Sequence, residues 1–150
     1  MDSCFSHILV ATDGSERADK ALALAVKMAR ERPGTHLSAV LVVHDFSTAD
    51  FVEVVSSLRG DFEQMRQQFA EKGRERLFNL LRPHAVQLPI DAVVEVSDAP
   101  HAAILATARR IGADLIVMAS RGHGPAASAL LGSQTQKVLA EAEVPVLVVR

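Results

Sequence analysis

Short apolar runs alternate along the chain with longer segments in which apolar residues recur every three or four positions. The short runs are typical of buried strands, and they lie at 6–12, 37–44, 90–96, 114–119 and 144–149. The longer segments predict four amphipathic helices, which span 15–32, 61–82, 98–111 and 133–142. We expect residues 46–55 to form a loop that leads into the second helix.

Turn and cap residues mark the expected ends of these elements. Asp13 or Ser15 is expected to cap the first helix, because both follow the first strand directly. Ser97 or Asp98 is expected to cap the third helix, and Gly112 stands where a C-terminal glycine belongs. These signals support the same division into strands and helices as the hydrophobic pattern.

The second predicted helix carries a glycine on its apolar stripe. Gly73 costs about 1 kcal/mol of helix propensity relative to alanine, so we expect this position to pack closely against the sheet. Pro83 and Pro89 are expected to bracket the connection from this helix to the third strand.

The order of the elements predicts the fold class. Strands that are apolar on both faces belong to parallel sheets that helices cover on both sides. Strict alternation of strand and helix, with right-handed crossovers, gives an α/β fold with a doubly wound parallel sheet of five strands. A chain of 150 residues suits one domain, so residues 1–150 are expected to form a single unit.

Composition narrows the functional classes. The chain is 49% hydrophobic and 23% charged, which excludes a disordered chain, and its net charge of −2 gives no electrostatic case for nucleic acid or an anionic membrane. No apolar run approaches the roughly 18 residues of a membrane span. A single cysteine, Cys4, allows no internal disulfide, and a cytoplasmic protein is expected.

Two loops are expected to hold a ligand, because doubly wound sheets bind ligands at the carboxyl ends of their central strands. After the first strand, Asp13 offers a carboxylate for ribose hydroxyls or backbone amides; as an alternative it belongs to a helix-entry turn. After the fourth strand, Gly122 and Gly132 allow backbone to approach an anion at a helix N-terminus. The alternative is a capping box formed by Ser133 and Gln136, which needs no ligand.

Four segments together resemble the universal stress protein family over essentially the whole chain. The resemblance implies a Rossmann-like sheet in the order 3-2-1-4-5 and a homodimer that forms through the C-terminal strand. The segments begin at Ile8, Gly112, Leu130 and Val144, and they read Ile-Leu-Val-Ala-Thr-Asp-Gly-Ser-Glu, Gly-Ala-Asp-Leu-Ile-Val-Met-Ala-Ser-Arg-Gly, Leu-Leu-Gly-Ser-Gln-Thr-Gln-Lys-Val and Val-Pro-Val-Leu-Val-Val-Arg.

The resemblance also implies a site for ATP, with Mg2+ brought by the phosphates. ATP-binding members carry Gly-x2-Gly-x9-Gly-[Ser/Thr]; here Gly122 and Gly132-Ser133 match, whereas the first glycine is Ala119. Two outcomes stay open at this position: the added methyl group reduces or abolishes ATP affinity, or a small side chain at the end of the strand is tolerated. The residues expected to contact the nucleotide are Ala11, Thr12, Asp13, Val43, Met118, Ala119, Arg121, Gly122, Gly132, Ser133, Gln134 and Thr135.

Other chemistry lacks a sequence signature. The six histidines show no metal-ligand spacing, and neither a Walker A motif nor a nucleophile elbow occurs. We therefore expect an ATP-binding stress-response module that is not an enzyme. Two alternatives remain, a nucleotide-independent dimeric scaffold of the same family and a weak ATP hydrolase.

Overall fold

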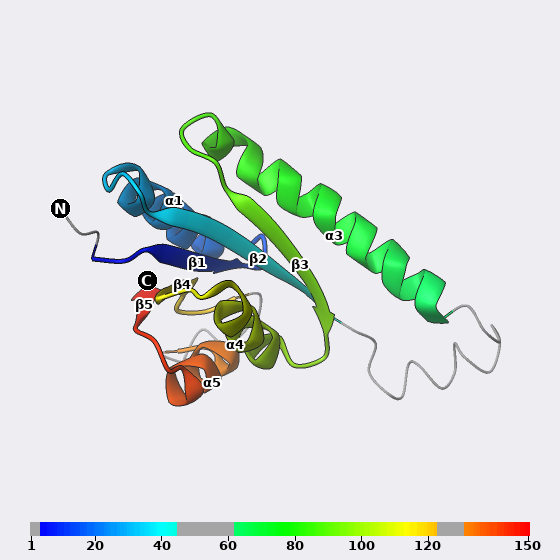
Figure 1. The fold of residues 1–150 in the computed structure, drawn as a ribbon. Coiled ribbons are helices and arrows are strands. Elements are labelled where there is room, and N and C mark those ends of the chain that lie inside the picture. The colour runs from blue at the N-terminus through cyan, green and yellow to red at the C-terminus, as the bar shows by residue number, and fades with distance from the viewer. Residues whose placement is uncertain (1–3, 45–61, 123–130) are drawn as a thin grey trace.

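The computed structural model describes residues 4–44, 62–122 and 131–150, and it confirms the predicted doubly wound fold (Figure 1). The five strands are parallel and follow the order β3-β2-β1-β4-β5. The elements are β1 (His7–Thr12), α1 (Glu16–Arg30), β2 (His36–His44), α3 (Phe62–Ala85), β3 (Asp91–Ser97), α4 (Pro100–Ile111), β4 (Leu115–Ala119), α5 (Ser133–Glu141) and β5 (Val146–Val149). The expected loop over 46–55 lies outside the described residues.

Helices cover both faces of the sheet (Figure 1). One face, which includes Ile8 and Val10, packs with α1 and α3 into a buried cluster. The opposite face, which includes Leu9 and Val40, packs with α4 and α5 into a second cluster. Neighbouring residues of a strand point to opposite faces, so the central strands carry apolar residues on both faces.

Small residues on α1 and α3 allow these two helices to pack closely against the sheet. Alanines dominate the buried stripe of α1, which lets this helix lie near the strands. At Gly73 of α3, an added Cβ would lie 2.6 Å from Val43 Cγ2 and 2.8 Å from Val94 Cγ1. The expected close contact at Gly73 is therefore confirmed.

Two predicted boundaries are wrong. α3 continues through Pro83 to Ala85, so the proline lies inside the last turn rather than at the start of the connection; the helix gives up one backbone hydrogen bond there. The N-cap of α4 is Ala99, without a side-chain cap, while Ser97 Oγ instead accepts a hydrogen bond from Ala99 N in the turn before the helix (3.0 Å). Gly112 is confirmed as the left-handed residue that ends α4 (φ 69°).

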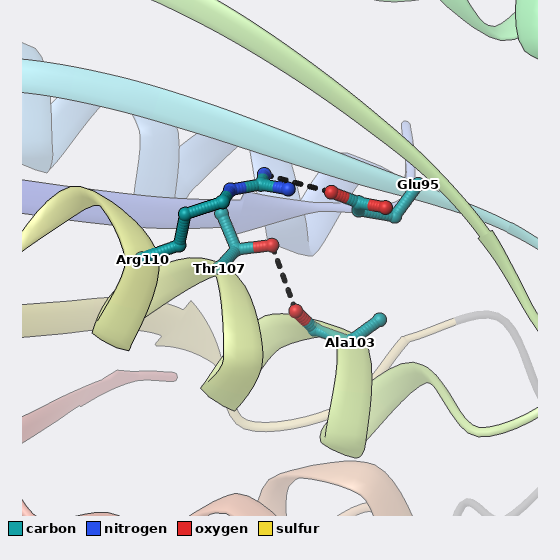
Figure 2. Close-up of polar contacts among 4 residues, drawn as sticks. All are labelled: Glu95, Ala103, Thr107 and Arg110. Carbon is teal, nitrogen blue, oxygen red and sulfur yellow. Dashed lines mark hydrogen bonds and ion pairs between the residues drawn. The ribbon is translucent and has the colours of Figure 1, made fainter.

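Figure 2 shows an ion pair between α4 and β3 and a hydrogen bond within α4. Arg110 Nη2 pairs with Glu95 Oε1 of β3 at 2.7 Å. Within the helix, the buried Thr107 donates its hydroxyl hydrogen to Ala103 O at 2.8 Å.

As a crossover between two parallel strands, α4 starts at the edge where β3 ends, which brings its N-terminus to the carboxyl edge of the sheet. Among the described residues, no helix is both long and apolar enough to cross a membrane.

Candidate functional site

A cavity of about 500 Å³ opens at the carboxyl edge of the sheet, beside the ends of β1 and β4. The N-termini of α4 and α5 border it, and its floor consists of strand residues. All the residues predicted for the nucleotide except Val43 line this cavity: Ala11, Thr12, Asp13, Met118, Ala119, Arg121, Gly122, Gly132, Ser133, Gln134 and Thr135. The structure thus brings two loops together that lie more than 100 residues apart in the sequence.

Val43 does not line the cavity. Its side chain points to the other face of the sheet, where it contacts Gly73 of α3. The cavity is instead lined by Val40 and Val42, which lie on the α4 side of β2. Because side chains alternate along a strand, a one-residue difference in the assignment moves the side chain to the opposite face.

Six further residues line the cavity that the sequence did not single out. They are Ala18, Val40, Val42, His44, Pro100 and Ile104. Topology offers a signal for the last two, because the helix after β3 must cross over β2 and β1 to reach β4. That crossover packs α4 against β2 and brings its first turn to the cavity.

The β1–α1 loop uses its own polar groups to satisfy its backbone. Asp13 Oδ1 accepts a hydrogen bond from Ser15 N at 2.9 Å, and Thr12 Oγ1 accepts one from Gly14 N at 3.2 Å. Ser15 Oγ in turn caps α1 by accepting from Ala18 N at 3.2 Å. Ser15, rather than Asp13, is therefore the N-cap, and Asp13 stabilises the turn before it.

Arg76 of α3 binds the backbone of the same loop. Arg76 Nη2 donates a hydrogen bond to Asp13 O at 2.9 Å. The Arg76 guanidinium also occupies the space where a Cβ on Gly14 would lie, and Gly14 has a positive φ of 78°. A side chain at position 14 would be strained by its backbone and would displace the arginine.

Gly122, in the described start of the β4–α5 connection, lies against Asp13. A Cβ at position 122 would overlap the Asp13 carboxylate, at Oδ2. A side chain at this position would force the Asp13 carboxylate to shift, and the contact joins the two parts of the cavity wall.

Among the described residues, no side chain caps the N-terminus of α5. Its N-cap is Gly132, and Ser133 is already the first helical residue, so the predicted capping box is wrong. Gln136 does not reach back to a cap residue's amide but donates its side-chain amide to Leu131 O at 2.9 Å. The first backbone amides of a helix have no acceptor within it, and on α5 they begin at a cavity-lining segment.

Ala119 does not close the cavity. It lines the cavity at the end of β4, yet it also belongs to the buried cluster on the α1 side of the sheet. Its carbonyl accepts a hydrogen bond from Thr135 Oγ1 at 3.0 Å, which ties α5 to β4. The cavity remains open beside the methyl group that distinguishes this chain from the glycine motif.

Comparisons with known proteins agree with this architecture. The chain matches the model of the universal stress protein family over residues 5–150. A universal stress protein of Thermus aquaticus, from the QAH/OAS sulfhydrylase 3' region, is 38% identical over 151 residues, which cover 97% of this chain and 99% of the relative. The solved structure of protein MJ0577 of Methanocaldococcus jannaschii is 25% identical with a TM-score of 0.78, and the match covers 96% of this chain and 94% of that one.

More distant solved structures share the fold. One is a universal stress protein in complex with cAMP (20% identity, TM-score 0.68, 99% of each chain), and another is a family member from Arabidopsis thaliana with AMP bound (16% identity, TM-score 0.57, 96% and 90%). The family model spans nearly the whole chain, and the Thermus relative has matching length. The chain belongs to the universal stress protein family.

Proposed function

We propose that this chain is a stress-response module that binds an adenine nucleotide, ATP, in the cavity at the carboxyl edge of the sheet. The observation that carries the proposal is the α5 N-terminus, which no side chain among the described residues caps and which borders the cavity. Helix N-terminal amides and the helix dipole favour phosphate oxygens. The apolar part of the cavity lining, with Val40 and Val42 of β2 and Ile104 of α4, suits the ring of a purine.

Structural relatives support the adenine part of the proposal. The two distant members described above hold cAMP and AMP, which share the adenosine group. The open space beside Ala119 further supports the ATP proposal, because the extra methyl group leaves the cavity intact.

The donor set suits an Mg2+ ion that ATP itself brings. Among the described residues, no group of three or more His, Cys, Asp or Glu side chains could hold a metal. Mg2+ in nucleotide sites keeps several waters and binds phosphates together with one or two carboxylates; Asp13 places a carboxylate on the cavity wall. No recognisable motif in the sequence positions a general base to hydrolyse ATP, so we propose binding without efficient hydrolysis.

Calorimetry with a matched pair of variants at Gly132 tests the proposal. The backbone there (φ −66°, ψ 156°) accepts any residue, and Asp and Asn are equally good N-caps. Both variants share the same tight contact, because an added Cβ would lie 3.3 Å from Arg121 Cα. Only Gly132→Asp places a negative charge where phosphate would bind.

We expect saturable ATP binding to the wild-type chain, and an affinity for Gly132→Asp that is about tenfold lower than for Gly132→Asn. Absence of saturable binding to the wild-type chain would overturn the proposal. Equal affinities of the two variants would show that ATP does not use the α5 N-terminus.

A second candidate function, that of a nucleotide-independent dimeric scaffold, rests on the edge strand β5. All four residues of Val146–Val149 are apolar and only partly buried, and β5 ends the sheet. An unpaired apolar edge favours pairing with a second copy of the chain. Sedimentation should then give a dimer with or without ATP and a monomer for Val148→Asp; a wild-type monomer at all concentrations would exclude this candidate.

A further inference from the structure

Gln134 connects the two helices that border the cavity. It is the second residue of α5, and it lines the cavity. Its side-chain Oε1 accepts a hydrogen bond from His101 N of α4 at 2.9 Å and lies 3.2 Å from His101 Nδ1. α4 begins with Pro100, which has no amide hydrogen, and its N-cap Ala99 supplies no side-chain cap. Gln134 therefore caps α4 from the neighbouring helix.

This contact determines which end of the Gln134 side-chain amide is the oxygen and which is the nitrogen. A backbone N–H only donates, so the atom that faces His101 N must be the oxygen. The nearby Nδ1 then donates as well, because an amide oxygen carries no hydrogen. A flipped amide would place its NH2 group against the backbone N–H of His101, two donors facing each other, and the arrangement in the structure avoids this.

The opposite end of the side chain is consequently a fixed donor. The described residues engage Gln134 through its oxygen, which leaves the two Nε2 hydrogens for a partner in the cavity. The same turn of α5 presents its first backbone amides, which are also donors. Two kinds of donor at one place match a group with several acceptor oxygens and no hydrogen, which is a phosphoryl group.

We propose that Gln134 is a specificity-determining residue, which selects ligands with a phosphoryl chain over the bare nucleoside by donating its Nε2 hydrogens to a phosphate oxygen. The inference rests on the proposed nucleotide site and adds to it a side chain that recognises the phosphate. Helix α4 keeps the donor oriented before the ligand arrives, which lowers the ordering cost of binding.

Two charge-matched variants of α5 test the role. Gln134→Glu retains an oxygen for His101 but replaces the donor by a negative charge. Gln136→Glu makes the same chemical change two residues later, on an exposed side chain that does not line the cavity, although it also removes the hydrogen bond to Leu131 O. Gln134→Met removes the polar end without adding charge. Calorimetry with ATP, AMP and adenosine on the full chain of each variant gives the readout, and thermal melting confirms that each variant is folded.

For the wild-type chain we expect ATP to bind more tightly than adenosine. Gln134→Glu should lower the affinity for ATP about tenfold while changing that for adenosine less than about twofold, and Gln134→Met should lower the ATP affinity about threefold. Gln136→Glu should leave both affinities within about twofold of the wild type. An unchanged ratio of ATP to adenosine affinity in both Gln134 variants would overturn the inference while the nucleotide site stands. No binding of any of the three ligands to the wild type would instead overturn the proposed function, and the inference with it.

Discussion

The N-termini of α1 and α5 lie at the same edge of the sheet, and each helix follows a central strand in the order of elements, yet they satisfy their backbone amides differently. At α1, Ser15 caps the helix, Asp13 accepts the amide of Ser15, and Arg76 holds the turn from α3. At α5, the N-cap is a glycine, and no side chain among the described residues replaces it.

The two helix starts therefore have different roles in the cavity wall: the start of α1 supports the wall, and the start of α5 offers donors to a ligand. A helix start whose amides are already bonded has little left to offer an anion, whereas an uncapped start retains both donors and dipole. Gly122 joins the two, because its missing side chain lets the β4–α5 loop lie against Asp13. We infer that the β1–α1 loop shapes the cavity and that α5 carries most of the binding.

The largest expected effect comes from separating the two loops. Gly122→Ala places a methyl group on the Asp13 carboxylate, which must move and give up its hydrogen bond to Ser15 N. We expect the free energy of unfolding to fall by about 1–2 kcal/mol and the ATP affinity to fall about tenfold. Chemical denaturation and calorimetry measure the two quantities.

A double-mutant cycle isolates the cause of this effect. In an Asp13→Ala background the obstacle is absent, so Gly122→Ala should cost less than about 0.5 kcal/mol of stability there. If the glycine substitution costs the same in both backgrounds, the loops are not joined through Asp13, and the α1 and α5 termini act independently.

A smaller effect should distinguish the serines of the two helix starts. Ser15→Ala removes an N-cap and should lower the free energy of unfolding by about 1 kcal/mol, with little change in ATP affinity. Ser133→Ala removes an exposed hydroxyl on the cavity wall that caps nothing, so stability should stay within about 0.5 kcal/mol while ATP affinity falls about threefold. A stability loss at Ser133 as large as that at Ser15 would contradict the contrast between the two termini.

The sequence predicted the fold because each strand and helix carries its own period. The alanine stripe of α1, the left-handed Gly112 and the close contact at Gly73 could all be anticipated from residue type and spacing. Pro83 shows the limit of such rules, since α3 continues beyond the proline to Ala85.

The site was less fully predictable, for two physical reasons. β2 is apolar on both faces, so hydrophobicity does not reveal which of its residues face the cavity, and Val43 was assigned in place of Val42. The capping box at Ser133 failed because the helix starts one residue earlier than the motif requires. The contact between Gln134 and His101 joins residues 33 positions apart and has no sequence signature.

The smallest expected effect lies at the opposite edge of the sheet, where Asp114 plays the part that Asp13 plays in the β1–α1 loop. Asp114 accepts hydrogen bonds from Ser6 N at 2.7 Å and His7 N at 3.0 Å. Burial acts to raise the pKa of Asp114, but the hydrogen bonds from the amides of Ser6, His7 and Asp114 itself, aided by the charge of His7, hold it below its ordinary value.

A lowered pKa in the folded state means that the ionised carboxylate stabilises the fold above the pKa of the unfolded chain, and that this contribution disappears as the pH falls through the folded pKa. Asp114→Asn should therefore cost about 0.5–1 kcal/mol of stability at neutral pH and flatten the loss of stability between about pH 5 and pH 2. Denaturation curves across that range measure it, with ATP affinity at neutral pH as the control. Since Asp114 lies at the far ends of the strands, that affinity should be unchanged, and a drop in it would show that the carboxyl edge does not function apart from the rest of the sheet.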